Sequence, residues 1–477
     1  MSQKVYPGLG VLLLLLLLAA TIFPQETDVG LIGIPGQMVV RVKSEGQISS
    51  LVRRYDVTLI DSVEDGRTFL VQIPPGKDFD SAADGITRSP LVESAHGNFL
   101  VSFPETFQIS QGFPDQRAPI YAFAESPVDY FTQPGTYSTG IDSAHQIATG
   151  SGVVVAVIDN GLVFDHPILQ DMQTVEGRDL LDDDNDPSET MEGLYVGHGT
   201  FVTSLVWLTA PDCQIMPIKA FDGNGVGDVF SLIQAIHWAK SHGANVINLS
   251  CGVDVNSPIL RSAIQAALSS GVVMVSAAGN SGDSTYYYPA AYDGVIGVTA
   301  IDENEMRADF ACYGSFVDLV APGVDVYGAL PGETDWGTWS GTSFSSPLVA
   351  GTAALVLQLN PEMLPGQVQN HLRASARIDL LWGTVNAPDS EYGYGALNAL
   401  NAVVGLAVGD MDLSGQRNVV DLELLADYVN NRLPGACESV IDMIADVNCD
   451  GVVDAQDTEA MAQFFNGNRR KWQPCYH

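Results

Sequence analysis

The apolar positions along the chain follow one dominant pattern. From about residue 149 onward, apolar segments of strand length alternate with helical stretches such as the amphipathic run at residues 230–243. The segments read VVVAVID, QIMPIKAF, ANVINLS, VVMVSAA and GVIGVTAI. Strands that are apolar on both faces and alternate with helices are typical of a parallel sheet covered by helices. We therefore predict an α/β fold with a doubly wound, mostly parallel sheet as the core of the molecule.

The flanking regions follow other patterns. Residues 37–103 contain alternating strands (MVVRV, TFLVQI and GNFLVSF) separated by helical stretches, which indicates a small α+β unit. Residues 104–136 bear Pro and aromatic residues without periodicity and are interpreted as a connector to the α/β region, residues 137–408. Residues 1–25 combine a positive Lys4 with an apolar run too short to span a bilayer, so we expect a cleaved secretory signal and no stable membrane span.

Composition narrows the functional classes. The 477 residues carry a formal net charge of −36, which repels nucleic acid and anionic membranes and suits an exported, soluble, cation-binding protein. Six cysteines are too few for a disulfide framework in a chain of this length.

Four polar residues stand where a sheet of this kind carries chemistry. Asp159 ends an apolar strand, His198 lies between two glycines before an apolar helix, and Asn280 follows a buried strand. Ser343 belongs to the run SGTSFSSP, directly before the apolar run PLVAGTAALVLQL, which indicates a buried helix with one of these serines at its N-terminus. Each residue alone is explained by capping, turn formation or packing. Their order within one α/β region favours a common site.

The motifs around these residues resemble the subtilisin-like serine peptidase family. The blocks VAVIDNGLVFDHP, HGTFVTSLV, VINLSCG, VMVSAAGNSG, FACYGSFVDLVAPG and SGTSFSSPLVAGTAAL match in order and spacing over about residues 140–408. The resemblance implies a subtilisin-like fold in which Ser343 is the nucleophile, His198 the base and Asp159 its orienting acid. Asn280 would stabilise the oxyanion, and Gly341 would let the substrate approach the backbone.

The resemblance also implies how substrate binds. A protein or peptide backbone would add as a strand between two edges, and a pocket would hold the side chain before the scissile bond. The first edge is Gly225, Val226 and Gly227, the second is Ser250, Cys251 and Gly252, and the pocket adds Ala277, Ala278 and Gly279. Phe201 departs from the second histidine usual in the family, which leaves the packing around His198 open. Cys251 replaces a larger apolar residue, which would alter the preference of the pocket.

Residues 409–470 contain an internal repeat in which each copy is a loop followed by a helix, and the second copy lies 36 residues after the first. The loops resemble the calcium loops of a type I dockerin, with oxygen-bearing residues at alternate positions as an EF-hand-like calcium site requires. The first loop offers Asp410, Asp412, Ser414, Asn418 and Asp421. The second offers Asp446, Asn448, Asp450, Asp454 and Asp457, with the carbonyl of Val452. We expect two calcium ions here and a cohesin-type protein partner at the cell surface. Cys449 would bridge to Cys437 or Cys475.

Several alternatives stay open. The loop at residues 178–189 either holds a further calcium ion near Asp182 to Asp186 or is a solvated acidic face. The unit at residues 37–103 resembles the inhibitor-type propeptide of the family, with SPLVESAHGNFLV as its closing strand, and otherwise is a retained accessory domain. The C-terminal repeat is either a docking module or a calcium clamp for the fold. The whole chain is either a secreted endopeptidase made as a zymogen or a scaffold that keeps the fold without activity.

Overall fold

The computed structural model describes residues 33–105, 120–122, 130–332, 336–377, 388–407, 424–426, 428–429, 435–436, 440–449 and 452–465. The predicted signal segment and the first predicted calcium loop, with Asp410, Asp412, Ser414, Asn418 and Asp421, lie outside these residues, as does Asp450.

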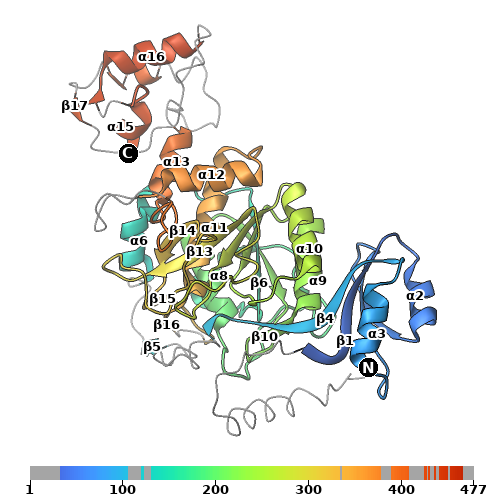
Figure 1. The fold of residues 1–477 in the computed structure, drawn as a ribbon. Coiled ribbons are helices and arrows are strands. Elements are labelled where there is room, and N and C mark those ends of the chain that lie inside the picture. Colours follow the sequence, from blue (N-terminus) through green and yellow to red (C-terminus); the bar gives the residue numbers. More distant parts are fainter. Residues whose placement is uncertain are drawn as a thin grey trace.

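A parallel sheet forms the core, as predicted (Figure 1). Its strand order is β14-β13-β12-β11-β6-β9-β7, with β8 paired to β9, and the pairs along it are parallel. The strands are β6 (Val154–Asp159), β7 (Gln173–Thr174), β8 (Arg178–Asp179), β9 (Gln214–Lys219), β11 (Val246–Leu249), β12 (Val273–Ala277), β13 (Val295–Ile301) and β14 (Leu319–Pro322). The central strands β6, β11 and β12 are buried almost throughout, because helices cover both faces.

The helices lie on the two faces of this sheet. On one face α8 (His198–Thr209) packs against α11 (Thr342–Leu359), and on the other α9 (Val229–Ser241) packs against α10 (Pro258–Ser269). Among the described residues, only α11 is long and apolar enough to cross a membrane, and 89% of it is buried inside the protein. It is therefore the central helix of a folded core. The shorter elements around this core are α6 (Pro134–Thr139), α7 (Ile141–Ala144), the 3-10 turn η2 (Pro167–Leu169), α12 (Pro365–Ser375), α13 (Ala399–Ala407), β15 (Val326–Ala329), β16 (Trp336–Trp339) and β5 (Ile120–Ala122).

Helix α11 begins at Thr342, so Ser343 lies at its start as predicted, and the apolar run from Pro347 continues the helix. Pro347 lies inside the helix and has no N–H to donate to the Ser343 carbonyl. Ser250 Oγ donates to that carbonyl instead, at 2.8 Å. A side chain from the end of β11 thus takes the place of the missing helical bond, which explains how the helix extends upstream of its proline.

The N-terminal unit joins the main body through its sheet. Its elements are β1 (Gly33–Val42), α2 (Ile48–Tyr55), β2 (Thr58–Ser62), β3 (Thr68–Gln72), α3 (Phe79–Thr87) and β4 (Val92–Ser102). Its strand order β10-β4-β1-β3-β2 includes β10 (Val226–Asp228) from the main body. The unit also has an apolar core of its own, which includes Val40, Leu51 and Val71. As Figure 1 shows, β4 leaves this unit and runs along the main body toward β10.

The C-terminal region projects from the main body beyond α13 (Figure 1). Its described elements are β17 (Gly435–Ala436), α15 (Val440–Ala445), β18 (Val452–Val453) and α16 (Ala455–Phe465). The second predicted calcium loop therefore lies between two helices, α15 and α16, as an EF-hand-like loop requires.

Candidate active site

Four side chains that the sequence singled out converge at the carboxyl edge of the large sheet. Asp159 is the last residue of β6, and Asn280 lies in the turn that follows β12. His198 is the first residue of α8, and Ser343 follows the first residue of α11. All four are at most 1% exposed. This edge is where α/β sheets gather ligand-binding groups, because several loops end there together.

Asp159 and His198 form a buried pair. His198 Nδ1 lies 2.8 Å from Asp159 Oδ1, which also accepts the backbone N–H of Asn160. Burial lowers the pKa of His198, but the carboxylates of Asp159 and Glu105 raise it by more than burial lowers it. The resulting pKa is about 10. The imidazole is therefore protonated at neutral pH in this state, and it cannot accept a proton from Ser343.

Asn280 is oriented by the residue before Ser343. Its Oδ1 accepts from both the N–H and the hydroxyl of Thr342, at 3.0 and 2.9 Å. This fixes which end of the carboxamide is the donor, and Nδ2 points into the site toward Glu105. A Cβ on Gly341 would lie 2.1 Å from Glu105 Oε1, so only glycine leaves room for a group at this point. Glycine is required at position 341 because a side chain there would occupy the space that Glu105 Oε1 fills.

The predicted substrate cleft is filled by the chain itself. Val226 and Gly227 of β10 pair with Ser102 and Val101 of the N-terminal unit in antiparallel register. On the opposite edge Ser102 exchanges both backbone hydrogen bonds with Gly252, at 3.2 and 3.0 Å. A strand from the N-terminal unit thus lies between the two edges assigned to substrate binding.

Phe103 continues this strand into the site. Its N–H donates to the carbonyl of Gly225 at 3.1 Å, and its ring stacks on the His198 ring with centroids 3.9 Å apart. Phe103, the last residue of the N-terminal unit predicted from the sequence, is fully buried. The imidazole is therefore shielded from solvent by a residue of the N-terminal unit.

Glu105 completes the obstruction and was not foreseen from the sequence. Its Oε2 accepts from Ser343 Oγ at 3.0 Å, and its Oε1 accepts from Asn280 Nδ2 at 3.0 Å. His198 Nε2 has no hydrogen-bond partner among the described residues and is 3.6 Å from Glu105 Oε2. The Ser343 hydroxyl donates to a carboxylate of the same chain and makes no hydrogen bond to His198 Nε2. Glu105 stands in a stretch interpreted as a connector, where no local pattern marks it.

Glu189 is a second residue that sequence reasoning missed. It accepts the backbone N–H of Gly197 and the hydroxyl of Thr200, the latter at 2.6 Å, and so holds the first turn of α8 on which His198 stands. Burial raises the pKa of Glu189 to about 7, although these two hydrogen bonds lower it. In the sequence it was one more acid in the loop at residues 178–189.

The predicted side-chain pocket lies beside the start of α11, where the N–H of Gly279 donates to the Thr342 hydroxyl. Ala277, Ala278 and Cys251 are fully buried, and burial raises the pKa of the Cys251 thiol. A Cβ on Gly279 would approach Cys312 Sγ to 3.0 Å, at a φ of +108° that favours glycine. Both thiols are thus packing groups in this state.

Phe201 answers the question of packing near His198. Its ring lies against Trp339 and Phe344, with centroids 5.8 and 4.9 Å away. These two rings also contact His198. An aromatic shell therefore encloses the face of the site where this chain has Phe201 in place of the second histidine usual in the family.

The acidic loop at residues 178–189, where a further calcium ion was considered, makes hydrogen bonds and ion pairs within the protein. Among the described residues no three His, Cys, Asp or Glu side chains lie together as a metal ion would require. In the loop near Asp182 to Asp186, Asp183 pairs with Arg178 and Asp186 accepts from Ser188. Asp183 and Asp186 of this loop thus bind neighbouring groups of the protein.

The second C-terminal loop is closed by its last acid. Asp446 and Asp457 are both fully buried, and Asp457 accepts the backbone N–H groups of Asn448 and Asp454, at 3.1 and 2.8 Å. Val452 lies in β18, and Cys449 is disulfide-bonded, as the sequence suggested.

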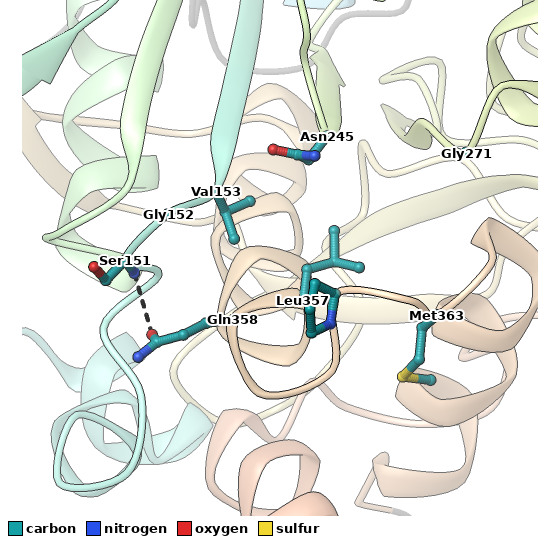
Figure 2. Close-up of a pocket in the computed structure, with 9 residues that line it drawn as sticks. Ser151, Gly152, Val153, Asn245, Gly271, Leu357, Gln358 and Met363 are labelled. Atoms are coloured by element: carbon teal, nitrogen blue, oxygen red, sulfur yellow. Dashed lines mark hydrogen bonds between the residues drawn. The ribbon is translucent and has the colours of Figure 1, made fainter. Parts of the chain in front are cut away.

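A separate hollow of about 260 Å³ lies at the opposite, amino-terminal edge of the sheet. Figure 2 shows Gln358 directed at the backbone of Ser151, and its Oε1 also accepts the N–H groups of Thr149 and Gly150. Among the residues that line it none is acidic, basic or a nucleophile placed beside a base. This hollow offers structural hydrogen bonding and no chemistry comparable to the first site.

Comparison with known families gives two matches along the chain. The model of the subtilase family matches residues 150–395, and the model of the fervidolysin N-terminal prodomain matches residues 34–98. The chain is 33% identical to a thermophilic serine proteinase of Bacillus sp. (strain AK1), over 68% of this chain and 76% of that protein. It is 39% identical to subtilisin BL of Lederbergia lenta, over 53% of this chain and 90% of that protein.

Solved structures agree on the fold. The crystal structure of fervidolysin from Fervidobacterium pennivorans, a keratinolytic enzyme related to subtilisin, matches with a TM-score of 0.66 at 23% identity. The match covers 83% of this chain and 63% of fervidolysin. A protease from Pseudoalteromonas arctica matches at 27% identity with a TM-score of 0.51, over 59% of this chain and 99% of that protein.

Proposed function

We propose, from the premise that this chain belongs to the subtilase family of serine endopeptidases, that Ser343, His198 and Asp159 are its catalytic triad. The enzyme is made as a zymogen with an N-terminal prodomain, and its substrates are proteins or peptides. One observation carries the assignment of residues. Ser343 Oγ and Asn280 Nδ2 both donate to the carboxylate of Glu105, and His198 Nε2 lies 3.6 Å from it. This carboxylate lies where a substrate carbonyl would lie.

In the active state Ser343 Oγ attacks the carbonyl carbon of the scissile bond and passes its proton to His198 Nε2. His198 then delivers this proton to the leaving amine, and the acyl-enzyme is hydrolysed by water in the reverse sequence of proton transfers. Asp159 holds Nδ1–H at 2.8 Å, which fixes the tautomer with Nε2 toward Ser343 and stabilises the imidazolium.

Asn280 Nδ2 and the backbone N–H of Ser343 donate to the oxyanion of the tetrahedral intermediate. The hydrogen bonds from Thr342 to Asn280 Oδ1 orient this donor before the reaction, so no reorganisation is needed. In subtilisin, where this contribution was measured, loss of such a donor lowers kcat by about 10²- to 10³-fold. We expect a similar loss for Asn280→Ala here.

The prodomain would keep the enzyme latent until it is removed. Ser102 and Phe103 fill the cleft, and Glu105 takes the hydrogen bonds of the nucleophile and of the oxyanion donor. The predicted secretory signal at residues 1–25 supports export of this precursor, followed by removal of residues 37–103 with part of the connector.

A pair of serine variants tests the assignment. Ser343→Ala should abolish hydrolysis of casein by the secreted protein, because no other hydroxyl replaces Oγ. Ser340→Ala is the matched control: its hydroxyl accepts the backbone N–H of Asp325, outside the reacting groups, and casein should still be hydrolysed. Hydrolysis that persists in Ser343→Ala, while the protein remains folded, would refute the assignment.

We further propose that residues 409–470 are a calcium-dependent docking module of dockerin type for a cohesin-type protein. The two loops in 36-residue register support this, as do the buried Asp446 and Asp457 at the ends of the second loop. Oxygen ligands of this kind suit calcium, and the ion would neutralise the two buried carboxylates. The residues Asp446, Asn448, Asp454 and Asp457, with the Val452 carbonyl, would hold it.

Calcium binding and docking are tested separately. Calorimetry on the full chain should show calcium uptake that Asp457→Ala reduces, while casein hydrolysis continues. Capture of a cohesin-type protein should disappear with chelator, since the loops lose their shape without the ion. Calcium uptake without capture would leave the module as a clamp for the fold and reject docking.

A further inference from the structure

The prodomain strand marks out a register in the cleft. Ser102 pairs with Gly252 in an antiparallel bridge, so position 104 lies opposite Ser250, two residues earlier on that edge. The Ser250 carbonyl oxygen is 3.4 Å from Ser343 Oγ. A substrate lying in this register therefore presents the carbonyl of position 104 to the nucleophile, and Phe103 stands one residue before the residue whose carbonyl is attacked.

Phe103 occupies a pocket built of aromatic rings. Its ring stacks on His198 at a centroid distance of 3.9 Å and an interplanar angle of 14°. The edge of Tyr195 meets it at 5.8 Å and 89°, and Phe221 lies 5.1 Å away. Such stacked and edge-to-face arrangements are the favourable geometries for aromatic pairs.

Gly225 forms the remaining wall of this pocket. A Cβ at Gly225 would lie 2.5 Å from the Phe103 ring and 3.0 Å from the Tyr195 ring, so the space for a large ring depends on a missing side chain. The carbonyl of the same residue accepts the N–H of Phe103. The pocket thus holds both the backbone and the ring of its occupant.

We propose, on the basis of the proposed function above, that this pocket is an aromatic-selective subsite of the mature enzyme. Its preferred substrates carry Phe, Tyr or Trp one residue before the residue that forms the acyl-enzyme. A subsite binds a segment of its own chain and a segment of a substrate in the same way, provided that both add as a strand in the same register.

The stacking partner of the aromatic residue is the catalytic base itself. His198 is neutral when substrate binds and becomes an imidazolium as it takes the Ser343 proton. An aromatic face attracts a cation more strongly than a neutral ring. The contact is therefore stronger in the transition state than in the bound substrate, and the preference should appear in kcat as well as in KM.

Three internally quenched peptides test the proposal on the matured enzyme obtained from the full chain. They share the sequence around the cleaved bond and differ one residue before the acyl-forming residue, which is Phe, cyclohexylalanine or Ala. We expect kcat/KM for Phe to exceed that for Ala by at least about tenfold, with a higher kcat for Phe than for cyclohexylalanine. Equal values for Phe and Ala, or a cyclohexylalanine peptide as good as Phe, would overturn an aromatic subsite.

Two glycine variants with similar backbone conformation localise the effect. Gly225→Ala, at φ +68°, places a methyl group in the pocket and should reduce the Phe-to-Ala ratio toward one. Gly243→Ala, at φ +89° with open space around it, carries the same backbone strain elsewhere and should keep the ratio. If Gly225→Ala does not fold, Tyr195→Leu should lower the same ratio by removing one ring. A ratio unchanged in these pocket variants places the preference elsewhere and rejects the proposal.

The Phe-to-Ala ratio of kcat/KM and the proposed function are tested by separate measurements. Hydrolysis of casein that depends on Ser343 tests the catalytic assignment, whatever residue precedes the acyl-forming one. An active, Ser343-dependent enzyme that shows no preference for the aromatic peptide rejects only the subsite.

Discussion

Replacing Glu105 by Gln removes the charge from the group that blocks the site while keeping its size. Two hydrogen bonds end on this carboxylate, from Ser343 Oγ and from Asn280 Nδ2, and its Oε2 lies 3.6 Å from His198 Nε2. A hydrogen bond to an ionised group contributes about 1.5–3 kcal/mol, against about 0.5–1.5 kcal/mol for a neutral pair. Part of this difference returns because a neutral amide costs less to bury. We therefore expect the docked prodomain to lose about 1.5–2 kcal/mol, or roughly 10- to 30-fold in its binding constant.

The assay follows the appearance of activity in purified precursor. Wild type should show a lag before it hydrolyses a chromogenic peptide, and Glu105→Gln should shorten this lag. Glu64→Gln is the matched control, since Glu64 is an exposed acid of the same prodomain. A Glu105→Gln precursor with the wild-type lag and the wild-type cleavage products would refute the reasoning that this carboxylate sustains latency.

The pH dependence supplies an independent check on the same contact. The pKa of His198 is raised from 6.5 to about 10 in the blocked state. The part of this rise that Glu105 causes stabilises the blocked state while His198 is protonated, and it is lost as the pH rises through about 10. The wild-type lag should therefore shorten toward alkaline pH. The Glu105→Gln lag should depend less on pH, because one of the two carboxylates that raise this pKa is gone.

Three further changes test other parts of the structure. Thr342→Val removes one of the hydrogen bonds that orient Asn280, and should lower kcat about fivefold, as a loss of about 1 kcal/mol implies, with KM nearly unchanged. Glu189→Ala leaves buried donors at the start of the His198 helix unpaired, and should lower the free energy of unfolding by about 2–5 kcal/mol in a denaturant titration. Asp457→Ala should abolish protection of the C-terminal loop from proteolysis by calcium while casein hydrolysis continues, and equal calcium protection in variant and wild type would contradict its role as a ligand.

The parts of the structure that the sequence predicted are those with a local signal. Near-continuous apolar strands indicated the parallel sheet, and the ends of two of them located Asp159 and Asn280. Glycines around His198 and the hydroxyl-rich run before an apolar helix located the other two groups. These signals are local because a strand end or a helix start fixes where a side chain can point.

The residues that the sequence did not predict act across long separations in the chain. Glu105 reaches Ser343 over 238 positions, and its own surroundings in the sequence resemble a connector. Glu189 binds the start of α8 from a loop in which acids are common. The hydrogen bond to the Ser343 carbonyl in the first turn of α11 was likewise missed, because it comes from Ser250, nearly a hundred residues away.

Three consecutive residues, the last of the predicted prodomain and the first two of the connector, would explain how a segment bound like a substrate keeps the enzyme latent. Phe103 supplies the ring contacts and the backbone bond to Gly225 that a good substrate would make. Pro104, in the place of the residue to be attacked, has no N–H to donate to the Ser250 carbonyl opposite. Glu105 then accepts the hydrogen bonds of Ser343 Oγ and Asn280 Nδ2, two groups that the proposed mechanism needs in the transition state. Affinity comes from the first residue and resistance to attack from the other two, so substitutions at Phe103 and at Glu105 should separate binding of the prodomain from the latency that it imposes.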